Sequence, residues 1–161
     1  MSNYVNFKRS PGPDGQLEEI SLVSLVNLNN DFVVTAVRDK SGKLKLISWK
    51  VDSNGGITRS AGPDVQGEEI SLVSILPFYH SRTVTVVQDK GGILKLKLWE
   101  ADKDKGDIHS SPGKEFQDKE ENLAYVIDDF SNDGLTIAVL DRSGKMKLIY
   151  YYVAGMGFPR S

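Results

Sequence analysis

The sequence predicts an all-β protein built from three tandem repeats, and three observations lead to this fold class. The heptapeptide EEISLVS occurs at Glu18–Ser24 and again at Glu68–Ser74, an interval of 50 residues. The segments after each copy are rich in Val, Ile, Thr and aromatic residues and are separated by glycine-containing turns, as strands are. No segment of useful length has the period of an amphipathic helix.

The repeats extend over nearly the whole chain of 161 residues, which we expect to form a single repeat domain. Residues 11–60 form the first repeat, 61–110 the second and 111–161 a weaker third, after a strand-like segment at 1–10. A valine in the central strand and an aromatic residue in the next recur in all three repeats: Val37, Val87 and Val139, and Trp49, Trp99 and Tyr151.

Each repeat is expected to hold four antiparallel strands. In the first repeat these are EISLVSLV, FVVTAVRD, LKLISWKV and a short fourth strand at Ile57–Ser60. The loops DKSGK, DKGGI and DRSGK join the second and third strands of the three repeats, and their glycines are expected to adopt positive φ. DSNGG at Asp52–Gly56 predicts a second tight turn.

The third strand of the first repeat is apolar on both sides, which favours a β-propeller blade covered by a neighbour on each face. The EEISLVS copies would then be the innermost strands. Three blades are too few for a ring, so we expect two chains to form a six-bladed ring, with Tyr4–Ser10 exchanged between them as a clasp. The alternative is a β-trefoil, which also has three repeats of four strands.

The stretch TAVRDKSGKLKLISW at Thr35–Trp49, followed by GITRS, resembles the units of bacterial propeller-like tandem-repeat proteins. The resemblance covers the first two repeats. The third departs from it, with Leu140–Asp141 in the V-R-D segment and Tyr151 in place of tryptophan. It implies a propeller fold. In architecture, the chain is also similar to small oligomeric propeller lectins, which implies carbohydrate binding by analogy.

Composition and charge narrow the function classes. With a net charge of −2, the chain has no strong field to attract nucleic acid or an anionic membrane, and we expect neither partner. No apolar run is long enough for membrane insertion, and MSNYVNFKRS has no secretory h-region. The absence of cysteine excludes disulfides and thiolate zinc sites. These features favour a cytoplasmic location and leave secretion open.

Catalytic and metal motifs are not found, so we expect a protein that is not an enzyme and has no cofactor. The two histidines, His80 and His109, are followed by serines that point to the opposite face of a strand, which does not suit a catalytic triad. The aspartates of ADKDKGDIH lack the spacing of a calcium loop and are interpreted as a charged hairpin turn.

The leading function predicted is lectin-like carbohydrate binding at repeated sites between blades. Aromatic rings can stack on sugars while carboxylates and arginines bind hydroxyl groups, and the repeats supply such residues at Trp49, Trp99, Tyr151, Asp14, Asp64, Arg38 and Arg59. Several weak sites on one ring would add avidity. The competing interpretation places the tryptophans in the core between blades.

Two other functions are open from the sequence. One is a protein–protein scaffold, with Phe78 and Tyr79 of an aromatic loop as the anchor for a partner. The other is an enzyme with its site in the central channel, where repeated glutamates could hold a cation: Glu18, Glu19, Glu68, Glu69, Glu120 and Glu121.

Overall fold

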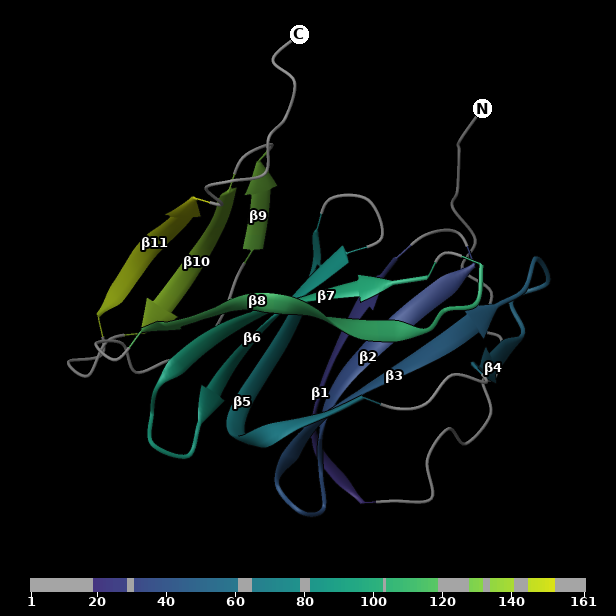
Figure 1. Cartoon of the computed structure of the whole chain (residues 1–161), viewed down its shortest axis with the longest axis horizontal. Coiled ribbons are helices and arrows are strands. Elements are labelled where there is room, and N and C mark those ends of the chain that lie inside the picture. Colours follow the sequence, from purple (N-terminus) through teal and green to yellow (C-terminus); the bar gives the residue numbers. More distant parts are fainter. Residues whose placement is uncertain are drawn as a thin grey trace, which may run out of the picture.

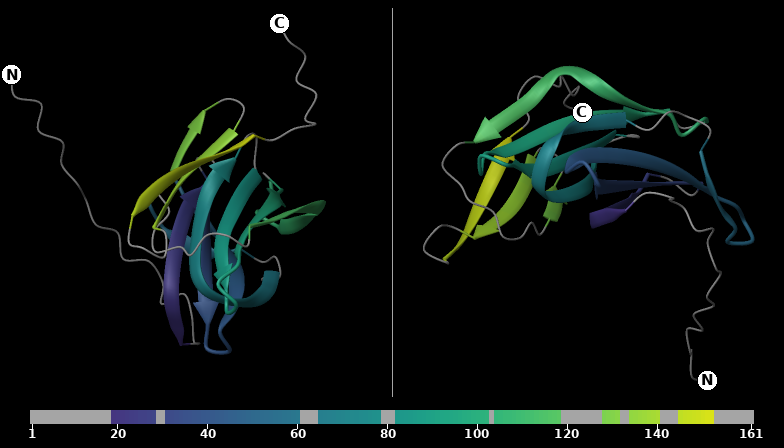
Figure 2. Two further views of the ribbon diagram at one scale, coloured as in Figure 1. Left: turned by 90° about the vertical axis from the view of Figure 1, so that its left-hand side faces the viewer. Right: turned by 90° about the horizontal axis from the view of Figure 1, so that it is seen from below.

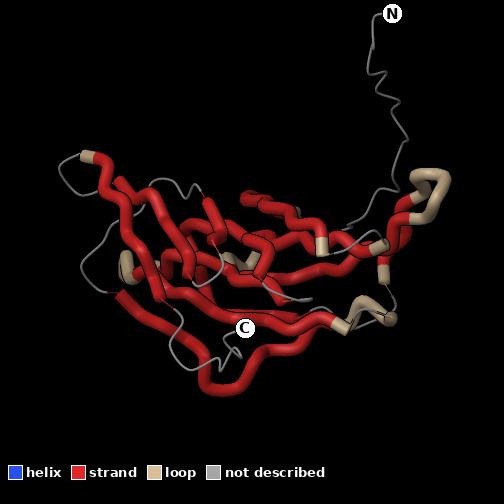
Figure 3. The backbone as a smooth tube through the Cα atoms, turned by 90° about the horizontal axis from the view of Figure 1, so that it is seen from above, coloured by secondary structure: helices blue, strands red, loops and turns tan. Residues whose placement is uncertain are grey.

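The chain is built from strands, as the sequence predicts (Figure 1). The computed structural model describes residues 19–28, 31–60, 65–78, 82–102, 104–118, 128–131, 134–140 and 145–152. Of these residues 75% lie in strands and none in a helix, so the prediction of an all-β protein is confirmed (Figure 3). No helix in the described part of the chain is long and apolar enough to cross a membrane.

The strands follow one another in short succession. They are β1 (Ile20–Asn27), β2 (Phe32–Asp39), β3 (Lys43–Val51), β4 (Ile57–Arg59), β5 (Val65–Phe78), β6 (Arg82–Asp89), β7 (Leu94–Ala101), β8 (Ile108–Asp118), β9 (Asp128–Ser131), β10 (Gly134–Leu140) and β11 (Met146–Tyr152). Strands β1 to β8 form one sheet in the order β1-β2-β3-β5-β6-β7-β8, with β4 on β3, and β11-β10-β9 form another. All pairs are antiparallel.

The strand β5 belongs to two sheet units at once. Its first residues pair with β3, up to Glu69 opposite Lys43, whereas Ile70 and the residues after it pair with β6. Register shifts in β3 near Lys43 and in β5 near Ile70 accompany the change of partner, as expected where a strand bends. The predicted fourth strand is therefore made in two pieces, β4 and the start of β5.

Three sheet units result. The first unit contains β1 to β4 and the start of β5, the second contains the rest of β5 with β6 to β8, and the third contains β9 to β11. The second unit repeats the pairing of the first: Val73 lies opposite Val87 as Val23 lies opposite Val37. The view from below in Figure 2 shows the third unit at one end of the molecule and the first unit at the other.

Each unit has two faces, because successive side chains of a strand point to opposite sides. We call one the tryptophan face; it carries Trp49 in the first unit, Trp99 in the second, and Ile137 and Ile149 in the third. The opposite side, the leucine face, carries the residues Leu44 and Leu46, Leu94 and Leu96, and Met146 and Leu148.

The units pack face to face through two hydrophobic cores. The leucine face of the first unit and the tryptophan face of the second bury Val26, Val34, Ala36, Leu44, Leu46, Ile70, Ile75, Val87, Trp99 and Ile108 between them. The leucine face of the second unit buries Leu76, Val84, Val86, Leu94, Leu96 and Leu98 together with Ile137 of the third. The second unit is thus covered on both faces.

The hairpin loops have the predicted chemistry. Gly42 and Gly92 have φ values of 81° and 82°, which confirms the positive φ expected for these two loops. In each loop the preceding aspartate accepts backbone N–H groups on Oδ1: Asp39 from Ser41 and Lys43 at 2.8 and 2.9 Å, and Asp89 from Gly91 and Ile93 at 2.8 and 3.0 Å. Residues 141–144 of the DRSGK loop and the Tyr4–Ser10 segment lie outside the described residues.

Candidate binding surfaces

Trp99 is a core residue. Only 1% of its surface is exposed, and it packs between the first and second units. Its indole Nε1 donates a hydrogen bond of 2.8 Å to Thr85 Oγ1, and Lys97 Nζ lies 4.6 Å from the ring centroid. A ligand cannot stack on a ring in this position, so Trp99 fits the packing interpretation and not the carbohydrate one.

Trp49 makes the same hydrogen bond but is partly exposed. Its Nε1 donates to Thr35 Oγ1 at 2.9 Å, on the tryptophan face of the first unit. No other described unit covers that face. Arg59 on β4 lies directly opposite Trp49 on β3, which places the two residues on one face of neighbouring strands. The structure thus brings together two of the predicted carbohydrate-binding residues.

Arg38 does not join this pair. It lies opposite Leu44, whereas Trp49 is five positions further along β3, a separation of roughly 17 Å at the usual rise per residue. Its Nη1 donates a hydrogen bond of 3.1 Å to Ser21 Oγ on β1. Arg38 therefore lies at the other end of the strands from Trp49 and Arg59.

The other predicted site residues divide into two groups. Asp14, Asp64 and Tyr79 lie outside the described residues, and for Tyr151 only the strand position, opposite Leu135, is described. Phe78 is not part of an exposed loop: it ends β5 and packs against the core between the second and third units. Phe78 is partly buried, and its role as an anchor for a partner stays a prediction.

The repeated glutamates of β5 face lysines. Lys95 Nζ forms an ion pair with Glu68 Oε2 and lies 3.4 Å from Asp89 Oδ2, and Lys90 Nζ lies 2.6 Å from Glu69 Oε2. The hydrogen bond that Lys95 donates to Glu68 raises the pKa of Lys95, and the one that Lys90 donates to Glu69 lowers the pKa of Glu69. Glu68 and Glu69 therefore pair with lysines of β7 and of the β6–β7 loop instead of facing a central cation, and the hypothesis of a channel site loses these two residues.

The described residues contain no group of three metal-ligating side chains. Of the other glutamates in that hypothesis, Glu18, Glu120 and Glu121 lie outside the described residues.

The aspartate-rich loop between β7 and β8 is a turn, as expected. Asp102 Oδ1 accepts the N–H groups of Asp104 and Lys105 at 2.8 and 3.1 Å, and these hydrogen bonds lower the pKa of Asp102. The loop leans on the first unit: Ser60 Oγ donates to Lys105 O at 2.9 Å, and Gly106 is buried. Its role is contact between units. His109, exposed on β8, lies opposite Glu100, and His80 lies outside the described residues.

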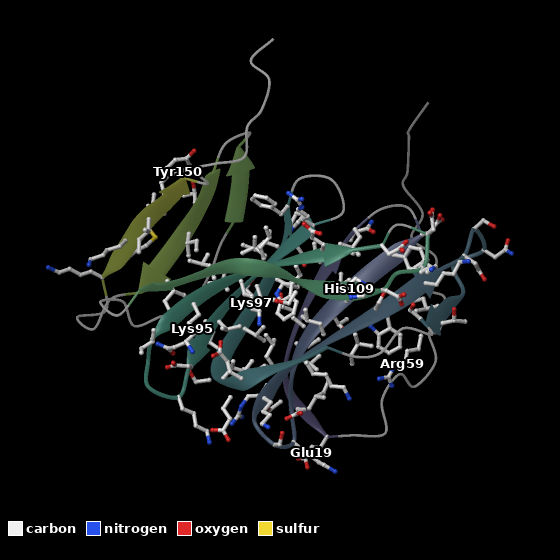
Figure 4. The ribbon with its side chains drawn as sticks, viewed as in Figure 1. Glu19, Arg59, Lys95, Lys97, His109 and Tyr150 are labelled. Atoms are coloured by element: carbon white, nitrogen blue, oxygen red, sulfur yellow. The ribbon has the colours of Figure 1, made fainter. Side chains whose placement is uncertain are left out.

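Exposed apolar side chains mark two surfaces that the sequence analysis missed. Among the described residues, the large exposed hydrophobic ones are Ile20, Val23 and Leu25 on β1, and Met146, Leu148 and Tyr150 on β11. The first three lie on the tryptophan face of the first unit and the others on the leucine face of the third. Figure 4 shows Tyr150 on β11 and Arg59 beside β4 at opposite ends of the molecule. Five of the six positions match a buried residue of the second unit, and Val23 matches the partly buried Val73.

Comparison of the chain with protein-family models, curated proteins and solved structures gives no match.

Proposed function

We propose that this chain is a non-enzymatic interaction module of the propeller type, with three blades and an apolar contact surface at each end. The observation that carries the proposal is the gathering of exposed apolar side chains on the two outer faces of the stack. Contiguous exposed apolar patches of this kind are typical of protein contact sites.

The arrangement of strands supports blades over the β-trefoil. The strands of the first two units pair in sequence order, as four-stranded meanders, and the units pack face to face. The described strands follow an open path from β1 to β8 and do not close into a barrel. Four-stranded sheets arranged in this way are the building blocks of propellers.

A non-enzymatic role is supported by the tasks that the chemically interesting residues already perform. Asp39, Asp89 and Asp102 hold turns through their Oδ1 atoms, and Glu68 binds Lys95. These charged side chains thus shape hairpins and join sheet units.

Sedimentation of a labelled chain tests the interaction module. We compare the wild type with a Val23→Asp/Leu25→Asp double variant and with His109→Asp, at an exposed residue of the second unit, as the control. The runs are made in buffer and in cell extract. The wild type and the control are expected to sediment as a complex in at least one medium, and the double variant as a monomer in both. A wild type that is monomeric in both media would refute the proposal.

Carbohydrate binding is the second candidate, favoured by the partly exposed Trp49 directly opposite Arg59. A glycan array probed with the wild type, Trp49→Ala, Arg59→Gln and the control His109→Asp tests it. Binding by the wild type and His109→Asp that both site variants lose supports a lectin. If the wild type binds no glycan, this candidate is rejected. Since Trp49 lies on a proposed contact face, a glycan and a protein partner would compete for it.

A further inference from the structure

We propose that the two outer faces fit each other, so that a second copy of the chain covers both and closes a ring of six units. The inference rests on the proposed function and names the partner: the leucine face of the third unit binds the tryptophan face of the partner's first unit. The contacts already present inside one chain supply the template.

Both contacts between units use the same pair of faces. The leucine face of the first unit packs on the tryptophan face of the second, and the leucine face of the second packs on the tryptophan face of the third. A hydrogen bond of 3.1 Å from the Ile75 N–H to Ser24 Oγ crosses the first of these contacts. One kind of interface therefore repeats along the stack.

The tryptophan face of the first unit is open along β1, although Val37 on β2 and Ile47 on β3, on the same face, are each 1% exposed. Leu25 is 61% exposed, whereas Ile75, at the same position of the second unit, is 3% exposed. Ile20 is 39% exposed and its counterpart Ile70 is fully buried. Trp49 is partly exposed and Trp99 is buried. These residues are as apolar as their counterparts in the second unit, but no leucine face of another described unit covers them.

The leucine face of the third unit is open in the complementary way. Met146 and Leu148 are 70% and 67% exposed, whereas Leu94 and Leu96, their counterparts in the second unit, are 0% and 7% exposed. Tyr150 is 52% exposed at the position of the buried Leu98. The chain thus ends in one face of each kind, which is what a head-to-tail contact requires.

The turn contacts point to the same partner. Gly106 of the second unit sits close to Phe32 and Ser48 of the first, as a Cβ at Gly106 would lie 2.6 Å from the Phe32 ring and 2.9 Å from Ser48 Oγ. The third unit has Gly134 and Tyr150 at these two positions. Gly134 thus takes the place of Phe32, and Tyr150 takes the place of Ser48. The third unit, like the first, therefore has one aromatic ring where the turn of a neighbouring unit would pack. In the dimer, the turn at Gly55, which matches Gly106, would meet the partner's Tyr150.

Two chains are the number that closes the ring. Head-to-tail contacts give closed rings where the rotation permits and open filaments where it does not. Propellers have about four to eight blades, so two chains of three units fall in this range and three chains do not. A closed dimer leaves neither outer face exposed.

Light scattering on a gel-filtration peak, with two complementary variants, tests the ring. The wild type and the control, His109→Asp on the second unit, are expected at twice the 17.8 kDa of the chain. Val23→Asp/Leu25→Asp alters one face and Met146→Asp/Leu148→Asp the other, so each alone weakens both contacts of a homodimer, by about a hundredfold or more. An equimolar mixture keeps one intact contact and is expected to recover the dimer mass. Circular dichroism and thermal unfolding establish that each variant is folded.

The other outcomes overturn the inference in different ways. A monomeric wild type up to the highest soluble concentration excludes the second copy, and a complex that forms only in cell extract does the same while leaving the interaction module standing. If one double variant stays dimeric, the contact joins like faces. Species larger than a dimer indicate an open chain of copies, with no ring.

Discussion

At the residue scale, one hydrogen-bonded pair recurs with different surroundings. The indole of Trp49 donates to Thr35 Oγ1 and that of Trp99 to Thr85 Oγ1, at 2.9 and 2.8 Å. Each threonine hydroxyl in turn reaches a carbonyl of β3 or β7, at 3.4 and 3.5 Å. The third unit replaces both members together, with Ile137 for threonine and Tyr151 for tryptophan. The pair is therefore a unit of the repeat.

Replacing each threonine by valine tests whether the hydrogen bond contributes more to stability at the buried Trp99 than at the partly exposed Trp49. Thr85→Val leaves the buried indole N–H of Trp99 without its acceptor, and an unsatisfied buried donor costs about 1–3 kcal/mol. Thr35→Val is expected to cost less, because the partly exposed Trp49 has access to water. Urea unfolding of both variants measures the difference. Equal losses would show that Trp49 is as well buried as Trp99 in solution.

The ion pair of Lys95 is the other local feature with a measurable consequence. The Lys95 side chain is 13% exposed, between Glu68 and Asp89. Burial acts to raise the pKa of Asp89, but hydrogen bonds from the Ile93 N–H and Lys95 outweigh it and lower the pKa. A carboxylate with a lowered folded-state pKa stabilises above its unfolded pKa, and that stabilisation is lost as the pH falls. The raised pKa of Lys95 affects stability at alkaline pH instead. The stabilisation by its charged form is lost only as the pH rises past the usual lysine range.

We therefore expect Lys95→Met to lower the free energy of unfolding by about 1–3 kcal/mol at neutral pH, because two partly buried carboxylates lose their partner. The loss of stability below about pH 4 should be shallower in this variant than in the wild type. Lys90→Met, which removes the exposed ion pair with Glu69, is the control and is expected to change little. A steeper acid loss in Lys95→Met would contradict the assignment. Chemical unfolding at pH 2–7 provides the measurement.

At the scale of elements, the strands and turns that join units matter most. β5 completes the first sheet unit and begins the second, so the two units cannot be separated without breaking one continuous strand. The β7–β8 turn adds a second connection, through Gly106 against Phe32. The corresponding turn of the first unit, with Gly55 at φ 82°, has no such neighbour among the described residues.

Alanine at these two glycines measures the turn contact. Gly55→Ala and Gly106→Ala both force an alanine into positive φ, at a cost of about 1–2 kcal/mol. Gly106→Ala must also displace the Phe32 ring, and overpacking of this kind costs about 1–3 kcal/mol more. Thermal or urea unfolding is expected to show the larger loss for Gly106→Ala. Equal losses would mean that the turn does not press on the first unit.

At the scale of the whole molecule, the stack leaves its outer faces open. The second unit is packed against another described unit on both faces, whereas the first and third are packed on one face each. Their outer faces carry the exposed apolar residues at the two ends, although Val37 and Ile47 on the outer face of the first unit are buried. A second copy bound to these faces would link folding to assembly by mass action.

The proposed dimer predicts that stability depends on protein concentration. The midpoint of thermal unfolding should rise as the concentration of the wild type is increased tenfold and again tenfold, because association stabilises the folded chain. Val23→Asp/Leu25→Asp should show a constant midpoint over the same range. Differential scanning fluorimetry at each concentration measures both. A constant wild-type midpoint would contradict the dimer.

The local structure could be read from the amino-acid sequence alone. Alternating apolar residues specify strands, an aspartate followed by glycine specifies the hairpin turns at Gly42 and Gly92, and repetition specifies that the units share one design. These features could be predicted because each depends on residues close together in the chain. Three features depend on the folded arrangement of the units: Trp99 is buried whereas Trp49 is partly exposed, β5 passes between two units, and Glu68 pairs with Lys95. They could not be predicted because burial and ion pairing depend on the neighbouring unit, and two nearly identical repeats have different neighbours.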